Sequence, residues 1–242
     1  MSYIYRLKWD SDFFGYEIGR VNTSSLEDFD LSAFEKESKN YKLIYVYSNQ
    51  KLPANGNFKL VDEKVTFQQE ININNEININ NIFSKKQLQC SFCSFDEKEH
   101  DIIQLRQLAL ESGVYSRFNK DKDFKDNEYS KLYGAWLDNS VNGELAFDVL
   151  IAIKNNKILG FTTIGKKNEM LVDIGLVAVD ESVRGHGIGT KLIKETIKRA
   201  EKSNFQIIQV VTQRQNVPAM KLYEKTNFKV KQIVNIYHYW NL

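Results

Sequence analysis

The chain has 242 residues, of which 26% are charged, and its formal net charge is only +2. This length allows one large or two modest domains with a substantial hydrophobic core. The balanced charge excludes recruitment to nucleic acid or to acidic membranes by an overall field. No apolar run reaches membrane-spanning length and no apolar signal follows Met1, so a cytoplasmic protein without nucleic-acid or membrane partners is expected.

Residues 1–95 are predicted to form a smaller N-terminal α/β domain. Within it, the helix over 27–40 is expected to bury Leu31 and Phe34. The expected elements, in chain order, are a strand, an aromatic-lined turn and a second strand within 1–20, a helix over 27–40, a strand over 43–47, a turn over 53–57 and a strand over 58–70.

A short Ile-Asn repeat spans residues 68–81. Its isoleucines share one parity, so an extended segment would place all of them on one face: Ile71, Ile73, Ile77 and Ile79. An edge strand or hairpin is the first interpretation, and a disordered low-complexity linker over 69–82 is the alternative. Neither interpretation gives this segment a chemical role.

Cys90 and Cys93 form the C-x-x-C pair of the chain. A zinc site would need a second pair or nearby histidines, and the sequence offers His100, His186 and His238 alone. We therefore expect reduced thiols and no metal. His238 could serve as a base, but a packed or exposed histidine near the chain end is the favoured interpretation.

Residues 96–242 are predicted to form a second α/β domain with a mixed sheet. The expected elements are a helix over 98–112 that buries Ile102, Leu105, Leu108 and Ala109 and ends at Gly113, strands over 146–154, 158–164, 173–179, 206–212 and 230–240, and a helix after Gly187 that buries Ile188, Leu192, Ile193, Ile197 and Ala200.

Three alternate glycines, Gly185, Gly187 and Gly189, lie between the strand over 173–179 and that helix. Glycines at this spacing let backbone N–H groups converge without obstruction, and the helix N-terminus adds about half a positive charge. The segment is therefore predicted to bind a phosphate or pyrophosphate.

The order Arg-Gly-x-Gly-x-Gly resembles the coenzyme A loop of the GNAT acyltransferase superfamily. The strand before it and the later Asn216, Ala219, Tyr223 and Phe228 match the family pattern in order, with Asn227 where the family usually has glycine. The resemblance covers roughly residues 148–242. It implies a C-terminal GNAT fold, acetyl-CoA as cosubstrate and direct attack without a covalent enzyme intermediate.

The same resemblance implies the residues of the cofactor site. Backbone N–H groups of the central strand would polarise the thioester carbonyl, and Tyr223 would protonate the leaving thiolate as general acid. The implied cofactor contacts are Leu176, Val177, Ala178, Val179, Arg184, Gly185, His186, Gly187, Ile188, Gly189, Thr190, Asn216 and Tyr223. The general base stays open: a water chain could suffice, and Asp173 is a candidate, although a solvent-facing Asp173 is favoured.

Three segments resemble a narrower group, the TDP-fucosamine acetyltransferases, which act on nucleotide-linked amino sugars. These segments are Trp-Asp-Ser-x-Phe-Phe-Gly near the N-terminus, Ser-Arg-Phe at 116–118, and the tail Tyr-His-Tyr-Trp. Arg117 offers a planar fork for phosphate, and aromatic rings offer stacking faces. The resemblance implies Arg117, Phe118, Phe14 and Tyr129 as substrate contacts. The alternatives are a core role for the aromatic residues and, for Arg117, a surface position beside core aromatics.

The predicted activity is transfer of acetyl to the amine of a nucleotide-linked amino-deoxy sugar, with TDP as the favoured nucleotide, in polysaccharide synthesis. The rivals are acetylation of another primary amine, such as a peptide N-terminus, polyamine or antibiotic, and a non-catalytic module that binds coenzyme A. A homodimer is compatible with either assignment. Which sugar and nucleotide, and which acyl chains, are not fixed by the sequence.

Overall fold

A computed structural model describes residues 3–24, 29–52, 58–71 and 88–241. The strands are β1 (Tyr5–Arg6), β2 (Ile18–Thr23), β3 (Leu43–Ser48), β4 (Phe58–Glu70), β5 (Ser91–Ser94), β6 (Asp148–Lys154), β7 (Lys157–Lys166), β8 (Leu171–Val179), β9 (Ile207–Gln213) and β10 (Lys229–Trp240). They form one mixed sheet in the order β1-β2-β3-β10-β4-β9-β8-β7-β6-β5. The predicted α/β class with a mixed sheet is confirmed.

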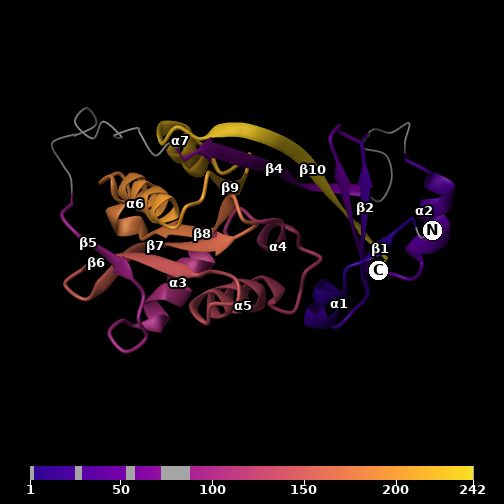
Figure 1. The fold of residues 1–242 in the computed structure, drawn as a ribbon. Coiled ribbons are helices and arrows are strands. Elements are labelled where there is room, and N and C mark those ends of the chain that lie inside the picture. Colours follow the sequence, from indigo (N-terminus) through magenta and orange to yellow (C-terminus); the bar gives the residue numbers. More distant parts are fainter. Residues whose placement is uncertain (1–2, 25–28, 53–57, 72–87, 242) are drawn as a thin grey trace.

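The helices pack on both faces of this sheet. They are α1 (Lys8–Phe14), α2 (Leu31–Ser38), α3 (Ile102–Ser112), α4 (Arg117–Lys120), α5 (Glu128–Val141), α6 (Ile188–Lys202) and α7 (Val217–Lys225), with a short 3-10 helix η2 (Glu181–Val183). One core joins α6 and α7 to the sheet, and a second core joins α3 and α5 to its opposite face. Figure 1 shows these helices on either side of β6 to β9.

The long strands β4 and β10 link the N-terminal elements to the rest of the sheet (Figure 1). β10, the last strand of the chain, lies between β3 and β4 and pairs with both in antiparallel fashion. β4 in turn pairs with β9. The sheet is therefore continuous across residue 95, and a division into domains at that residue stays a prediction.

The structure corrects two expectations for the N-terminal part. The expected aromatic-lined turn is the helix α1, which ends at Gly15 in a left-handed conformation with φ of 77°. Leu31, expected to be buried, is 52% exposed because it occupies the first position of α2, whereas Phe34 is fully buried as expected.

The helix expected over 98–112 begins only at Ile102. The side chain of Asp101 accepts a hydrogen bond from the N–H of Ile103, which caps the helix there.

Most of the isoleucine repeat, including Ile73 and Ile77, lies outside the described residues, as does the turn expected over 53–57. Among the helices that the structure describes, none is long and apolar enough to cross a membrane.

Candidate active site

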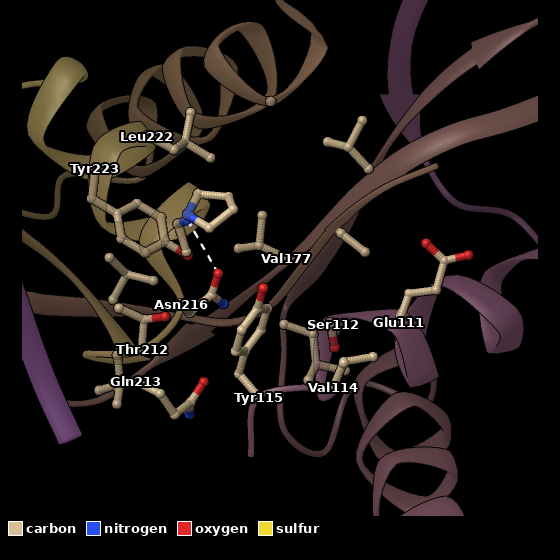
Figure 2. A pocket seen from close by; sticks show the side chains of 18 of the residues that line it. Glu111, Ser112, Val114, Tyr115, Val177, Thr212, Gln213, Asn216, Leu222 and Tyr223 are labelled. Carbon is tan, nitrogen blue, oxygen red and sulfur yellow. Dashed lines mark hydrogen bonds between the residues drawn. The ribbon is translucent and has the colours of Figure 1, made fainter. Parts of the chain in front are cut away.

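A single cavity of about 1120 Å³ opens between the glycine loop, β8, β9, α7 and the segment 111–118. This volume is at the upper end of the range for small-molecule sites, so the cavity has room for two substrates. It brings together all of the predicted cofactor contacts except His186. Figure 2 shows Tyr223, Asn216 and Val177 facing the same space, with Tyr115 across it.

The cavity exists because β8 and β9 separate. These parallel strands pair only from Leu171 to Ile174 on β8. Beyond that point a bulge places Gly175 and Leu176 opposite Thr163, whose hydroxyl oxygen accepts the N–H of Leu176 at 2.8 Å. A β carbon at Gly175 would lie 2.8 Å from the same oxygen, so glycine is required there. The edge of β8 past the bulge is therefore free to face a ligand with its backbone.

The glycine loop leads from β8 into α6. Gly185 and Gly187 have φ of 81° and 83°, and a β carbon at either position would meet no atom within 4 Å. Gly187 is the N-cap of α6 and has no side chain to satisfy the N–H groups of the first turn. Open space in front of free N–H groups and a helix N-terminus fits the pyrophosphate of acetyl-CoA.

Two predicted contacts of this loop, Arg184 and His186, also have partners within the protein. The Nε of Arg184 donates to the carbonyl of Val179 at 2.9 Å, and its guanidinium pairs with Glu111 at 2.9 Å. The Nδ1 of His186 lies 3.1 Å from the carbonyl of Arg184 and 3.2 Å from that of Val183. Both side chains therefore hold the loop in shape, and His186 lies outside the cavity lining.

The phosphate-binding role of the loop can be tested with Gly187→Asn, because asparagine tolerates positive φ while its side chain fills the space in front of the loop. Acetyl-CoA at about 100 times its Kd should raise the melting temperature of the wild-type protein by about 5–10 °C. Gly187→Asn should lose this shift. Gly143→Asn is the matched control, since Gly143 has φ of 82° and open space but lies outside this cavity. An equal shift in both variants would contradict the assignment.

Tyr223 enters the cavity from α7. It is 3% exposed, and its ring packs near Phe67 and Phe228 with centroid distances of 5.6 and 6.0 Å. Burial raises the pKa of the phenol, so it holds its proton firmly. Asn216 precedes the same helix, and its Oδ1 accepts the N–H of Ala219 at 3.2 Å (Figure 2). Asn216 thus caps α7 and fixes the helix that carries Tyr223.

Arg117 and Phe118, at the start of α4, also line the cavity. The guanidinium of Arg117 stacks over the rings of Tyr45 and Phe118, with its Cζ 4.7 and 4.4 Å from their centroids. Its Nε is buried and makes no hydrogen bond within the part of the chain that the structure describes. Burial acts against the charge, but nearby phenols and the carboxylates of Asp62 and Asp10 raise the pKa of Arg117 overall. The guanidinium of Arg117 is therefore held in place by the two rings and remains charged.

Asp62, which the sequence did not point to, lines the same cavity, and the charge of Arg117 acts on its carboxyl. It is 6% exposed, and its Oδ1 has no hydrogen-bond partner among the described residues. Burial raises the pKa of its carboxyl to about 7. Asp173 also lines the cavity rather than facing bulk solvent, but its Oδ1 accepts a hydrogen bond from Gln209 at 3.0 Å. Asp62 is therefore the carboxylate with free acceptor capacity.

Two predicted substrate contacts lie outside the cavity. Phe14 stacks behind Phe118 with ring centroids 5.9 Å apart, in an aromatic cluster with Tyr16 and Phe124. The hydroxyl of Tyr129 donates to the carbonyl of Leu110. From the helix of Tyr129, Tyr133 and Trp136 line the cavity instead.

His238 is fully buried at the core side of β10, as the packed interpretation expects. Its Nδ1 lies 2.6 Å from Asp121, and burial lowers the pKa of His238 to about 4.

Cys90 and Cys93 are free thiols, and the Sγ of Cys93 lies 3.8 Å from the Nε2 of His100. Neither His238 nor the two cysteines line the cavity.

A glycine loop at a helix N-terminus, a bulged strand that parts from its parallel neighbour and a buried tyrosine beside them define a protein of the GNAT class. In agreement, a sequence model described as the acetyltransferase (GNAT) family matches residues 107–228, about half of the chain. The chain belongs to this family.

Two curated proteins resemble the chain at moderate identity. The spore coat polysaccharide biosynthesis protein SpsD of Bacillus subtilis is 27% identical over 141 residues, which are 58% of this chain and 48% of the relative. The dTDP-fucosamine acetyltransferase of Escherichia coli O6:H1 is 28% identical over 144 residues, 59% of each protein. The chain thus spans about half to three-fifths of the length of these relatives.

A solved structure of a tandem GNAT protein from the clavulanic acid biosynthesis pathway matches with a TM-score of 0.56 at 12% identity. The match covers 86% of this chain and 67% of that structure, so the similarity of fold extends into the N-terminal elements.

Proposed function

We propose that the protein transfers acetyl from acetyl-CoA to the amine of a nucleotide-linked amino-deoxy sugar, with TDP as the favoured nucleotide. The observation that carries this proposal is the arrangement of one cavity. Its glycine loop suits a pyrophosphate, and Tyr223 lines the same cavity as Arg117 and Asp62, whose charges act on each other. The names of SpsD and of the fucosamine enzyme support an amino-sugar acceptor for polysaccharide synthesis.

The residues of the cavity divide the chemistry among them. Asp62, with a pKa of about 7, takes a proton from the acceptor amine, whose own pKa is about 8 by analogy with α-amino groups. The backbone of β8 past Gly175 polarises the thioester carbonyl. As the new C–N bond forms and the C–S bond breaks, Tyr223 donates its proton to the sulfur. The second proton of the nitrogen, released as the C–N bond forms, returns to the Tyr223 phenolate, and Asp62 releases its proton to solvent after turnover.

Arg117 provides the test of the acceptor. Arg117→Ala should raise the KM for the nucleotide sugar about tenfold or more and leave that for acetyl-CoA nearly unchanged, because a charge-assisted contact contributes about 1.5–3 kcal/mol. Arg106→Ala is a suitable control, since Arg106 pairs with Asp138 and lies outside the cavity.

The measurement is thiol release from acetyl-CoA with a panel of nucleotide amino sugars, the matching free amino sugars, a polyamine and a peptide N-terminus. Preference for nucleotide sugars that disappears in Arg117→Ala supports the proposal. Equal turnover of the free amines, or no effect of Arg117→Ala, would exclude it.

A further inference from the structure

Lys64 on β4 and Lys167 after β7 line the cavity together with Arg117, and the charges of Arg117 and Lys167 both act on Lys64. Within the described part of the chain, none of these three cations has a carboxylate within ion-pair distance. Lysines at protein surfaces are commonly unpaired, but Lys64 is only partly exposed and its strand position is fixed by pairing with both β9 and β10. Partial burial of the Lys64 ammonium without a partner is unfavourable unless something else supplies the negative charge.

The cations are close enough to affect one another. Burial is the largest cause that lowers the pKa of Lys64. The next causes are the positive charges of Arg117, Lys167 and Arg20, and Asp173 acts in the opposite direction. Arg20 itself stacks on Tyr47 at 4.0 Å and lies outside the cavity lining. The repulsion at Lys64 would be relieved by an anion that enters the cavity.

The carboxylates of the same region do not supply that anion. Neither Asp62 nor Asp173 lies within ion-pair distance of Arg117, Lys64 or Lys167 among the described residues. The hydrogen bond from Gln209 is directed to Asp173. The unsatisfied positive charge therefore faces the space that the acceptor would occupy.

We propose that Lys64 and Lys167 complete an anion site with Arg117, and that this site takes both phosphates of a nucleoside diphosphate. Arg117 offers a planar fork that matches one phosphate in two hydrogen bonds, and the lysines act as point charges for the second. This inference rests on the proposed function and deepens it: it assigns the residues that hold the two phosphates of the nucleotide, and a sugar monophosphate or a neutral amine would leave Lys64 without its partner.

Calorimetric titration of the full chain with thymidine 5′-diphosphate and thymidine 5′-monophosphate tests the site, with acetyl-CoA saturating so that the glycine loop is occupied. The wild-type protein should bind the diphosphate about tenfold or more tightly than the monophosphate. Lys64→Gln should bring this ratio close to one without changing the Kd for the monophosphate. Arg117→Ala should weaken both ligands.

Two further variants keep the test interpretable. Lys167→Gln changes an exposed side chain, so it reports on the second phosphate even if Lys64→Gln folds poorly. Lys229→Gln, exposed at the start of β10 and outside the cavity, should bind like the wild type. A preference for the diphosphate that survives in both Lys64→Gln and Lys167→Gln overturns the inference and leaves the role of Arg117 standing. Failure of the wild type to bind either nucleotide would overturn the proposed acceptor as well.

Discussion

Replacement of Tyr223 by phenylalanine should lower kcat by about 10²–10⁴-fold and leave the binding of acetyl-CoA nearly intact. The hydroxyl acts on the leaving thiolate, a charge that develops only as the transition state is approached. Burial raises the pKa of Tyr223, so the phenol is fully protonated before the reaction and can donate to sulfur. Stopped turnover with a normal Kd for acetyl-CoA, measured by thiol release and calorimetry, is the expected result.

The fold offers a matched control for this variant. Tyr237 is also 3% exposed, but its hydroxyl accepts the N–H of Leu52 at 2.8 Å and lies outside the cavity. Tyr237→Phe should therefore lower the melting temperature, by the loss of a buried hydrogen bond of about 1 kcal/mol, with near-normal turnover. Tyr223→Phe should instead lose turnover and keep its melting temperature, because the phenylalanine ring keeps the contacts with Phe67 and Phe228.

A fully active Tyr223→Phe enzyme would contradict the assignment. In that case water or another phenol would protonate the thiolate. Tyr115 is the alternative that the structure favours, since it lines the cavity across from Tyr223 (Figure 2). A double variant, Tyr115→Phe with Tyr223→Phe, would distinguish Tyr115 from water.

The cofactor half of the site was predictable because its signals are local in sequence. Gly185, Gly187 and Gly189 follow a strand and open an amphipathic helix within about twenty residues, and Tyr223 follows in an ordered motif. Backbone conformation and helix periodicity determine this arrangement with little help from distant residues. The separation of β8 from β9 was not predictable in the same way, since it depends on Gly175 facing the Thr163 hydroxyl of a neighbouring strand.

The acceptor half depends on long-range pairing. Asp62 and Lys64 reach the cavity because β4 is inserted between β10 and β9, strands that lie far from it in the chain, at 229–240 and 207–213. One sequence signal was present: Asp62, Lys64 and Thr66 share one parity, opposite the buried Val65 and Phe67. A strand with a polar, charged face and a buried apolar face can line a site. Its partner strands were not evident from the sequence.

The aromatic string near the N-terminus shows how composition can mislead. Trp9, Phe13 and Phe14 favour a strand or turn by propensity, yet these residues form α1. The glycine at position 15 was the better signal, since glycine commonly ends a helix in the left-handed conformation. Packing of Phe14 against Phe118 then stabilises the helix against the rest of the fold.

Asp62→Asn should lower kcat/KM by about 10²–10⁴-fold at pH 8 and remove the acidic limb of the pH–rate profile. In the wild-type enzyme the carboxylate must be ionised to accept the amine proton, so kcat/KM should fall tenfold per pH unit below about pH 7. Asparagine has the same shape and cannot accept that proton. Steady-state rates between pH 5.5 and 9 measure both effects.

The same variant should make the protein more stable. An aspartate whose pKa is about 7 when folded and about 4 when unfolded holds its proton more tightly in the folded state. The wild-type protein therefore loses stability as the pH rises from about 4 to about 7. Asp62→Asn removes this loss, so its free energy of unfolding should exceed that of the wild type at pH 8, by at most about 4 kcal/mol, and match it at pH 4.

Glu63→Gln is the control for both measurements. Glu63 is the next residue on β4 but lies outside the cavity and pairs with Lys51 at 3.6 Å, so this variant should retain the wild-type activity and pH profile. Asp173→Asn tests the other carboxylate of the cavity. If Asp173→Asn removes the acidic limb and Asp62→Asn does not, Asp173 is the base. A gain in stability together with a loss of activity in Asp62→Asn alone would show that the buried carboxylate is kept for its chemistry, at a cost to the fold.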